Sequence, residues 1–320
     1  MKPIYKITAN GTDLDLGERL ISLSCSDESG FKSDSCSITL DDRNSSIELP
    51  NTGAVLSVYL GYESTGLSHI GNYIVNNVSL SGAPDRISIK AHGLDFKSSF
   101  KEKVSENHAS TTLGALVSAI ASKHGLAPKV AKDLSGVVID HIAQTNESDM
   151  HFLTRLAKMY GAVAKPTGGN LVFAIRDSAQ SVSGILLGIT TIDKSQVTSW
   201  SYSVSKREDY SKVKSEYLDF EQAETREIEV GEGDSTYVLQ STYGDKNEAE
   251  TVAKTALSRI KKDFRKLQLS TIGNPNLIAE SLILLSGFKP GISANWVITK
   301  VEHSLDSQGF RTQIEGEVYE

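Results

Sequence analysis

Polar and apolar residues alternate along much of the first hundred residues. A period of two is typical of strands with one buried face, and it recurs at residues 19–24, 35–40, 54–60, 73–75 and 85–90. Turn-forming residues separate these stretches at 41–44, 50–51 and 81–84. The pattern predicts a small antiparallel barrel or sandwich over residues 1–100.

The pattern changes to helical spacing in the next hundred residues. After a polar connector at 101–106, we predict a helix that begins near Ser110 or Thr111 and ends at Gly125. A second helix should begin near Asn146, with Asp149 in a capping-box-like arrangement, and end at Gly161. The apolar stripes are Leu113, Leu116, Val117, Ile120 and Ala121, and then Phe152, Leu153, Leu156, Ala157 and Tyr160.

A hairpin signal follows the second helix. Gly168 and Gly169 separate two strand-like stretches at 162–165 and 170–175, and such a pair of glycines suits a tight turn between antiparallel strands. Residues 101–195 are therefore predicted to form a small α+β domain.

The last third of the chain returns to strands and contains one long helix. Strand patterns occur at 197–204, 235–239, 295–301 and 310–315. A helix is predicted from 247 to 265, with the stripe Ala249, Val252, Ala253, Ala256, Leu257, Ile260 and Phe264. We predict a mainly β (α+β) protein, in which 1–100 and 196–320 are antiparallel β-barrel or sandwich domains, the second with the long helix, and 101–195 is inserted between them.

Composition narrows the possible functions. The 320 residues have a net charge of −7 at pH 7, whereas proteins that bind nucleic acid through its phosphates need a basic face. We find neither a signal peptide nor an apolar stretch long enough to span a membrane. Cys25 and Cys36 are candidates for neighbouring strands, and we expect them to be reduced and buried.

No catalytic or phosphate-binding motif occurs in the sequence. It lacks GxxxxGK[ST], GxGxxG, HExxH and GxSxG patterns. The histidines have no helical i, i+4 pairing with carboxylate support, so no metal site is predicted: His69, His92, His108, His124, His141, His151 and His303. His124 comes directly before Gly125, where a cation suits the end of a helix.

Three charged clusters are candidates for catalytic or binding sites. Glu147 and Asp149 could be a glycosidase acid pair, but two acids in the first turn of a helix are more often capping residues. Residues 41–44 lack the pattern of a calcium loop and indicate a plain turn. The basic cluster of Arg259, Lys261, Lys262, Arg265 and Lys266 has no interleaved aromatic residues and indicates a solvated helix face. We therefore assign no catalytic, cofactor-binding or metal-binding residue.

Residues 144–157, QTNESDMHFLTRLA, resemble the Q-x-x-E-S-D-x-x-F-L-x-R-L-A signature of the phage late control D family of baseplate hubs and of VgrG proteins. Further stretches are similar to the same family, at 34–43, 49–62, 71–75, 80–85, 273–279 and 296–306. The resemblance runs in register along nearly the whole chain.

This resemblance implies a structural hub in the tail baseplate of a virion, assembled in the host bacterial cytoplasm, with no cofactor and no enzymatic activity. Family hubs are homotrimers in which six tube-like β domains form a pseudo-sixfold ring, matching a hexameric tail tube on one face and a trimeric spike on the other. The expected partners are the spike, the tail tube protein, the tape-measure protein and baseplate wedge proteins. Because VgrG proteins fuse hub and needle and this sequence ends at Glu320, a separate spike is expected.

Other readings remain open. The chain could be the hub of a tailocin or another contractile injection system. It could instead be a cell-wall glycan-binding or hydrolytic tail protein, whose middle domain would present Phe152, Tyr160 and Phe173 to a glycan. These three residues have core-like spacing, so packing is the expected role.

Overall fold

The computed structural model describes residues 1–30, 33–45, 47–93, 98–175, 189–205, 210–219, 222–261 and 264–318. The chain forms two compact units. Unit 1 comprises Met1–Phe96, Gly188–Tyr202 and Lys266–Glu320, and unit 2 comprises Lys97–Leu187 and Ser203–Arg265. The mainly β fold with an inserted α+β part is as predicted.

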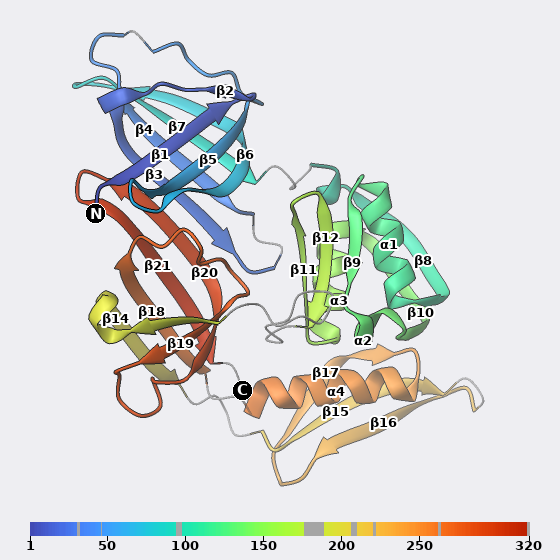
Figure 1. Ribbon diagram of the computed structural model, residues 1–320. Coiled ribbons are helices and arrows are strands. Elements are labelled where there is room, and N and C mark those ends of the chain that lie inside the picture. The colour runs from blue at the N-terminus through green and yellow to red at the C-terminus, as the bar shows by residue number, and fades with distance from the viewer. Residues whose placement is uncertain are drawn as a thin grey trace. The chain divides into compact units, whose positions relative to one another are not determined.

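The first part of unit 1 is an antiparallel β module (Figure 1). Its strands are β1 (Pro3–Ala9), β2 (Thr12–Asp13), β3 (Leu20–Glu28), β4 (Ser35–Asp41), β5 (Val55–Tyr62), β6 (Gly66–Ser81) and β7 (Arg86–Gly93), and the short 3-10 helix η1 (Gly17–Arg19) precedes β3. In β4 the buried residues Cys36, Ile38 and Leu40 alternate with Ser35 and Ser37, which are exposed. The predicted strands are confirmed, and their apolar faces meet in one core.

The two cysteines lie in this core. Cys25 and Cys36 are cross-strand neighbours on β3 and β4, both are free thiols, and their Sγ atoms lie 3.4 Å apart. Their predicted burial in the reduced form is confirmed. The hydrogen bond with Cys25, together with burial, raises the pKa of the Cys36 thiol.

The second β module of unit 1 is built from the end of the chain. Its elements are β13 (Thr190–Asp193), η3 (Lys194–Gln196), β14 (Val197–Ser205), β18 (Phe264–Ile272), β19 (Leu282–Ser286), β20 (Asn295–Asp306) and β21 (Gly309–Val318). A second core forms here around Trp296, Ile298 and Val301. The indole Nε1 of Trp296 donates to the carbonyl of Ile292 at 2.9 Å, so this fully buried ring has its polar group satisfied.

Unit 2 contains the two predicted helices and the hairpin. Its first elements are η2 (Ser98–Lys101), β8 (Lys103–Thr112), α1 (Leu113–Lys123), β9 (Ala127–Val130), α2 (Lys132–Ser135), β10 (Val138–Ser148), α3 (Asp149–Met159), β11 (Ala162–Thr167) and β12 (Asn170–Ile175). Thr112 caps α1 by accepting from the amide of Ala115 at 3.2 Å, and Gly125 follows the helix with a positive φ of 67°. The stripe of α1 is buried as expected.

Two predictions for this region were wrong. Residues 101–106 are not a connector, because Lys103–Thr112 is strand β8, paired with β10. The second helix does not begin at Asn146, which has a positive φ of 48° in β10 beside a register shift between Gln144 and Glu147. Helix α3 begins at Asp149, with Ser148 as its N-cap.

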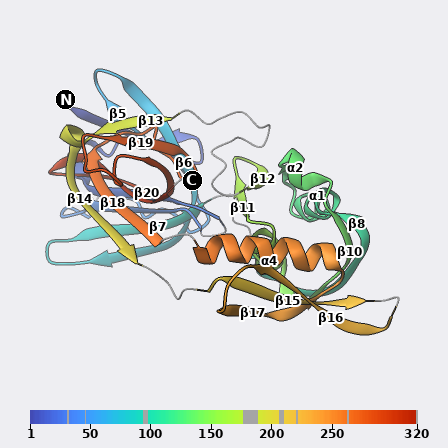
Figure 2. The same ribbon diagram turned by 90° about the horizontal axis from the view of Figure 1, so that it is seen from below.

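The long helix α4 (Lys246–Lys261) packs on a sheet of β15 (Lys212–Asp219), β16 (Glu224–Gly231) and β17 (Thr236–Tyr243), as Figures 1 and 2 both show. Val213 packs against Ala253, Ala256 and Leu257 of the helix. The sequence grouped this helix with the second β module, but residues 203–265 belong to unit 2. The division into domains 1–100, 101–195 and 196–320 stays a prediction. Phe264, expected on the helix, begins β18.

Candidate functional site

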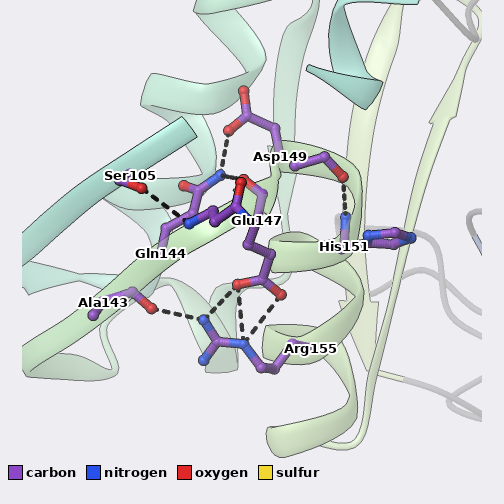
Figure 3. Close-up of polar contacts among 9 residues, drawn as sticks. Ser105, Ala143, Gln144, Glu147, Asp149, His151 and Arg155 are labelled. Atoms are coloured by element: carbon purple, nitrogen blue, oxygen red, sulfur yellow. Dashed lines mark hydrogen bonds and ion pairs between the residues drawn. The ribbon is translucent and has the colours of Figure 1, made fainter. Parts of the chain in front are cut away.

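The family-like segment 144–157 spans the end of β10 and most of α3 (Figure 3). The hydroxyl of Ser148 accepts from the amide of His151 at 3.3 Å, which satisfies one of the free amides of the first turn. Phe152, Leu153 and Leu156 are fully buried below the helix. Ser148, the middle residue of the E-S-D triplet, is therefore the cap, and its two acidic neighbours are free for other contacts.

Glu147 binds Arg155, two turns along α3. The Arg155 Nη2 atom lies 2.8 Å from Glu147 Oε2 and also donates to the carbonyl of Ala143 at 2.8 Å (Figure 3). The guanidinium carbon lies 5.1 Å from the ring centroid of Phe152. This ion pair ties the helix to the strand that precedes it, so Glu147 is neither a capping residue nor a free acid.

Asp149 is the centre of a buried polar network. Its Oδ1 accepts from the Gln144 amide at 2.8 Å, and its Oδ2 lies 2.8 Å from His124 Nε2 and 3.0 Å from Lys123 Nζ. The side chain is 3% exposed. Burial raises the pKa of this carboxyl, but hydrogen bonds from Gln144, Lys123 and His124 outweigh it and hold the pKa below its ordinary value.

His124 continues the network on its other side. The Ser99 hydroxyl lies 2.8 Å from Nδ1, and the imidazole stacks on Phe100 with ring centroids 3.8 Å apart. Serine, histidine and aspartate thus lie in the order of a hydrolase triad. However, the His124 side chain is only 1% exposed, and a substrate must reach the serine and the histidine together. We interpret the network as a structural feature that holds α1, β10 and α3 together.

The contacts of this network partly correct two predictions from the sequence, one for His124 and one for Asp149. His124 does end α1, as expected, but its ring is buried against Asp149 and does not cap the helix from solvent. Asp149 stands in the first turn, but its carboxylate binds side chains and not backbone amides. Sequence reasoning missed Ser99, Lys123 and Gln144. Gln144 is the first residue of the family-like segment, which was the available signal.

The other candidate residues do not converge. Within the described ranges, no group of three or more His, Cys, Asp or Glu side chains could hold a metal ion. His303 is enclosed, with Nδ1 at 3.0 Å from the Thr312 hydroxyl and Nε2 at 3.1 Å from the carbonyl of Leu277. Residues 41–44 form a turn in which Arg43 binds Asp41. The side chains of Arg259, Lys261 and Lys262 lie outside the described residues.

Unit 2 has a groove of about 730 Å³ between α3 and α4. His151, Arg155 and Lys158 line it from α3, and Glu248 is the one carboxylate among its described lining residues. Glycoside hydrolysis ordinarily needs two carboxyl groups across a cleft. Phe152 and Phe173 are fully buried, as expected of core residues, and Tyr160 is half-buried. The groove gives no support to hydrolysis.

The strongest candidate for a functional feature is the joint between the two β modules. β3 and β20 pair antiparallel from Ser22↔Asp306 to Glu28↔Lys300. Both modules thereby belong to one 13-stranded sheet among the described residues. Lys300 Nζ lies 3.6 Å from Glu28 Oε1, and the Ser24 hydroxyl donates to Glu302 at 2.7 Å.

The face of this sheet opposite both cores is rich in hydroxyl groups. On β3 and β4, Ser24 is the cross-strand neighbour of Ser37, and Ser26 that of Ser35. Across the joint, Ser24 also faces Ser304 of β20. A hollow of about 350 Å³ continues this face over the second module, and the polar side chains that line it are Ser199, Ser201, Gln268, Ser270, Lys300, Glu302, Gln313 and Glu315. The sheet thus presents a polar surface in which hydroxyl groups are mixed with charged side chains of both signs, such as Lys300, Glu302 and Arg311.

Comparison with known proteins identifies the family of this arrangement. The model of the phage tail baseplate hub (GPD) family matches residues 85–309. A relative described as a probable baseplate hub protein of Escherichia phage 186 is 30% identical over 99% of this chain and 93% of its own length.

Solved structures agree on the fold. The 43 kDa tail protein of prophage MuSo2 from Shewanella oneidensis matches 98% of both chains, with a TM-score of 0.73 and 17% identity. A type VI secretion component of E. coli matches 98% of this chain and 77% of its own, with a TM-score of 0.57 and 10% identity. The predicted likeness to both phage hubs and the secretion family is confirmed.

Proposed function

The chain belongs to the phage tail baseplate hub (GPD) family, and from this we propose that three copies form a ring that joins a hexameric tail tube to a trimeric central spike. The observation that supports it best is the β3–β20 pairing, which places two β modules side by side in every copy. Three such chains present six modules to the tube, while the ring keeps the threefold symmetry that a trimeric spike requires.

The packing of the two β modules fits this role. Two separate apolar cores, around Ile38 and around Trp296, hold the two modules. Leu305 and Phe310 of the second module are buried in the core of the first. The modules are therefore held at a fixed spacing by packing as well as by strand pairing, which a symmetry adaptor needs.

We assign the hydroxyl-rich sheet face to the wall of the central channel. Phosphate groups are held mainly by lysine and arginine, whereas serine side chains offer only neutral hydrogen bonds. Ser24, Ser37 and Ser304 on this face carry no charge, and its basic residues Lys300 and Arg311 are paired with Glu28 and Asp306. Such a wall would let DNA and the tape-measure protein pass without holding them. The net charge of −7 also disfavours the binding of DNA phosphates.

In this account the protein works in the tail baseplate of the virion and is assembled in the host bacterial cytoplasm. Its neighbours are the spike, the tail tube protein, the tape-measure protein and the wedge proteins, and it neither reads a DNA sequence nor catalyses a reaction. Hubs of tailocins and other contractile injection systems would need the same ring, so the proposal covers them.

Mass measurement in solution tests the proposal. The chain is measured alone and after mixing with the candidate spike protein, and we expect a complex of three hub chains with three spike chains. Capture of the spike without a preformed trimer would still support the role, because the spike could template the ring. A chain that stays monomeric and ignores the spike would contradict the proposal.

A further inference from the structure

The groove between α3 and α4 has the size of a ligand site. Its volume of about 730 Å³ lies within the range of roughly 300–1,000 Å³ that is typical of such sites. On α3, Phe152 and Leu156 are buried in the core, whereas His151, Arg155 and Lys158 line the groove. All the lining residues belong to unit 2, so the groove lies within one compact unit.

Much of the lining is apolar. The larger apolar side chains come from five elements, and they are Ile142 of β10, Met159 of α3, Leu218 of β15, Leu239 of β17 and Val252 of α4. Leu218 is 44% exposed. A ligand that covers these side chains would remove apolar surface from water, which favours binding.

β17 presents a free edge beside this groove. It is the edge strand of the sheet β16–β15–β17, and among the described strands only β15 pairs with it (Figure 1). Its sequence, TYVLQSTY, has neither a charge nor a proline, and five of its eight residues are exposed. A register shift leaves Leu239, Gln240 and Ser241 without a partner residue on β15, and Leu239 and Ser241 also line the groove. A strand edge without charge or proline is a template for an extended segment.

Lys158 is the one charged residue of the described groove lining that has no described partner. Arg155 is bound by Glu147, whose Oε2 lies 2.8 Å from Nη2, and Glu248 accepts from the Gly244 amide at 2.9 Å. Lys158 is exposed on α3, and no described acidic side chain pairs with it. An acidic group on a ligand would compensate this charge and make a charge-assisted hydrogen bond.

We propose that this groove binds an extended segment of a partner protein, which pairs with the free edge of β17, covers the apolar lining and places an acidic side chain against Lys158. Successive side chains of a strand point to opposite faces, so apolar residues at alternate positions of the segment meet the apolar lining together. The inference is independent of the proposed ring, because the groove belongs to unit 2 and the two β modules belong to unit 1.

Peptide selection on the full chain tests the site. Random peptides of about nine residues, long enough for one strand, are displayed on yeast and selected for binding to the native protein. We expect a consensus in which apolar residues alternate along the peptide, with an acidic residue and no proline.

Variants of the groove show where the selected peptides bind. Lys158→Glu should weaken their binding about tenfold or more, the effect of losing a charged hydrogen bond, and Ser241→Trp should block the groove. Lys132→Glu changes an exposed lysine of α2 outside the groove, and this matched control should bind as the native chain does. Circular dichroism checks the fold of each variant, and Lys158→Gln replaces Lys158→Glu if the latter does not fold.

Backbone methylation of a selected peptide tests the pairing with β17. Only alternate amides of a strand point towards one neighbouring strand, so N-methylation should abolish binding at every second residue and be tolerated at the residues between. The amides of Leu239, Gln240 and Ser241 should exchange more slowly with deuterium when the peptide is bound.

A selection that yields no binder, or peptides that bind the native chain and Lys158→Glu equally, would overturn the site. Equal effects of methylation at neighbouring residues would overturn the pairing with β17. A chain that forms the trimer with spike but selects no peptide would refute this inference and leave the ring standing. A chain that binds the peptides but never assembles with spike would refute the ring alone.

Discussion

Leu23 of the first β module and Leu305 of the second lie directly opposite each other on β3 and β20. Both side chains are buried in the core of the first module, at 1% and 7% exposure. The joint between the modules is therefore part of a hydrophobic core and not a surface contact, so the modules should unfold together.

We expect Leu305→Ala to lower the free energy of unfolding of unit 1 by roughly 2–5 kcal/mol, because it leaves a cavity in that core. Denaturation followed by tryptophan fluorescence should report this loss, because Trp296 and Trp200 both belong to the second module. Leu80→Ala is the matched control, since Leu80 is 62% exposed. If Leu305→Ala destabilises the first module but leaves the fluorescence transition of the second module unchanged, the modules unfold independently and are not held at a fixed spacing.

His303 should make unit 1 sensitive to acid. Burial lowers its pKa from 6.5 to about 4, so the folded state takes up this proton less readily than the unfolded state. The neutral His303 ring makes its full contribution to the free energy of unfolding above the unfolded pKa of 6.5. This contribution decreases as the pH falls from 6.5 towards 4, by about 3 kcal/mol in total. Unfolding measured at pH 7 and at pH 4.5 should show the loss, and His303→Gln should make it smaller. An equal pH dependence in both proteins would assign the effect to other groups.

Asp149 should contribute more to the stability of unit 2 than an exposed acidic residue does. Asp149→Ala leaves Gln144 and His124 buried without their partner, and we expect a loss of about 3 kcal/mol in the free energy of unfolding. Asp133→Ala, on an exposed acid of α2, is the control. Because the pKa of Asp149 is lowered, its contribution should be present above the ordinary carboxyl pKa and be lost as the pH falls below it. Similar losses for both variants would refute the role of the network.

Gly273 leaves no room for a side chain beside Phe310. A Cβ atom at this position would overlap the Phe310 ring, and the Gly273 amide also donates to the Phe310 carbonyl at 2.9 Å. Gly273→Ala should therefore cost about 2 kcal/mol, and Phe310→Leu in the same chain should recover part of it. Gly93→Ala is the control, since its Cβ would meet Asp34 at an ordinary 3.5 Å. Strictly additive effects of the two substitutions would exclude this contact as the cause.

The hydroxyl-rich face gives a prediction about DNA. Lysines at Ser24, Ser37 and Ser304 should make the assembled ring retain DNA at low salt, and the retention should disappear as salt is raised. Asparagines at the same three positions are the neutral control. The assay is retention of double-stranded DNA by the hub–spike complex, followed by the rate of DNA ejection from particles that contain the lysine variant. Unchanged retention and ejection would place this face outside the channel.

The sequence predicted the elements whose periodicity depends on burial. The stripes of α1 and α3 and the alternation in β4 each follow from one apolar face. β8 was missed because most of its residues are exposed and it is held by pairing with β10, which leaves no apolar period. The stripe of α4 predicted a helix, but a stripe does not specify which sheet it covers.

The polar network could not be derived from spacing. His124 and Asp149 are 25 residues apart, and an acid in the first turn of a helix is usually exposed, so local rules favoured capping. The shared pattern of the family-like segment indicated that Gln144, Glu147 and Asp149 belong together, but only the folded chain shows that they contact different partners.

Electron microscopy of the hub–spike complex, viewed along its axis, tests the central claim most directly. The account predicts six β modules around a channel, contributed by three chains, with β3–β20 joints alternating with joints between chains. A ring with one β module per chain at the channel, or a number of chains other than three, would contradict it.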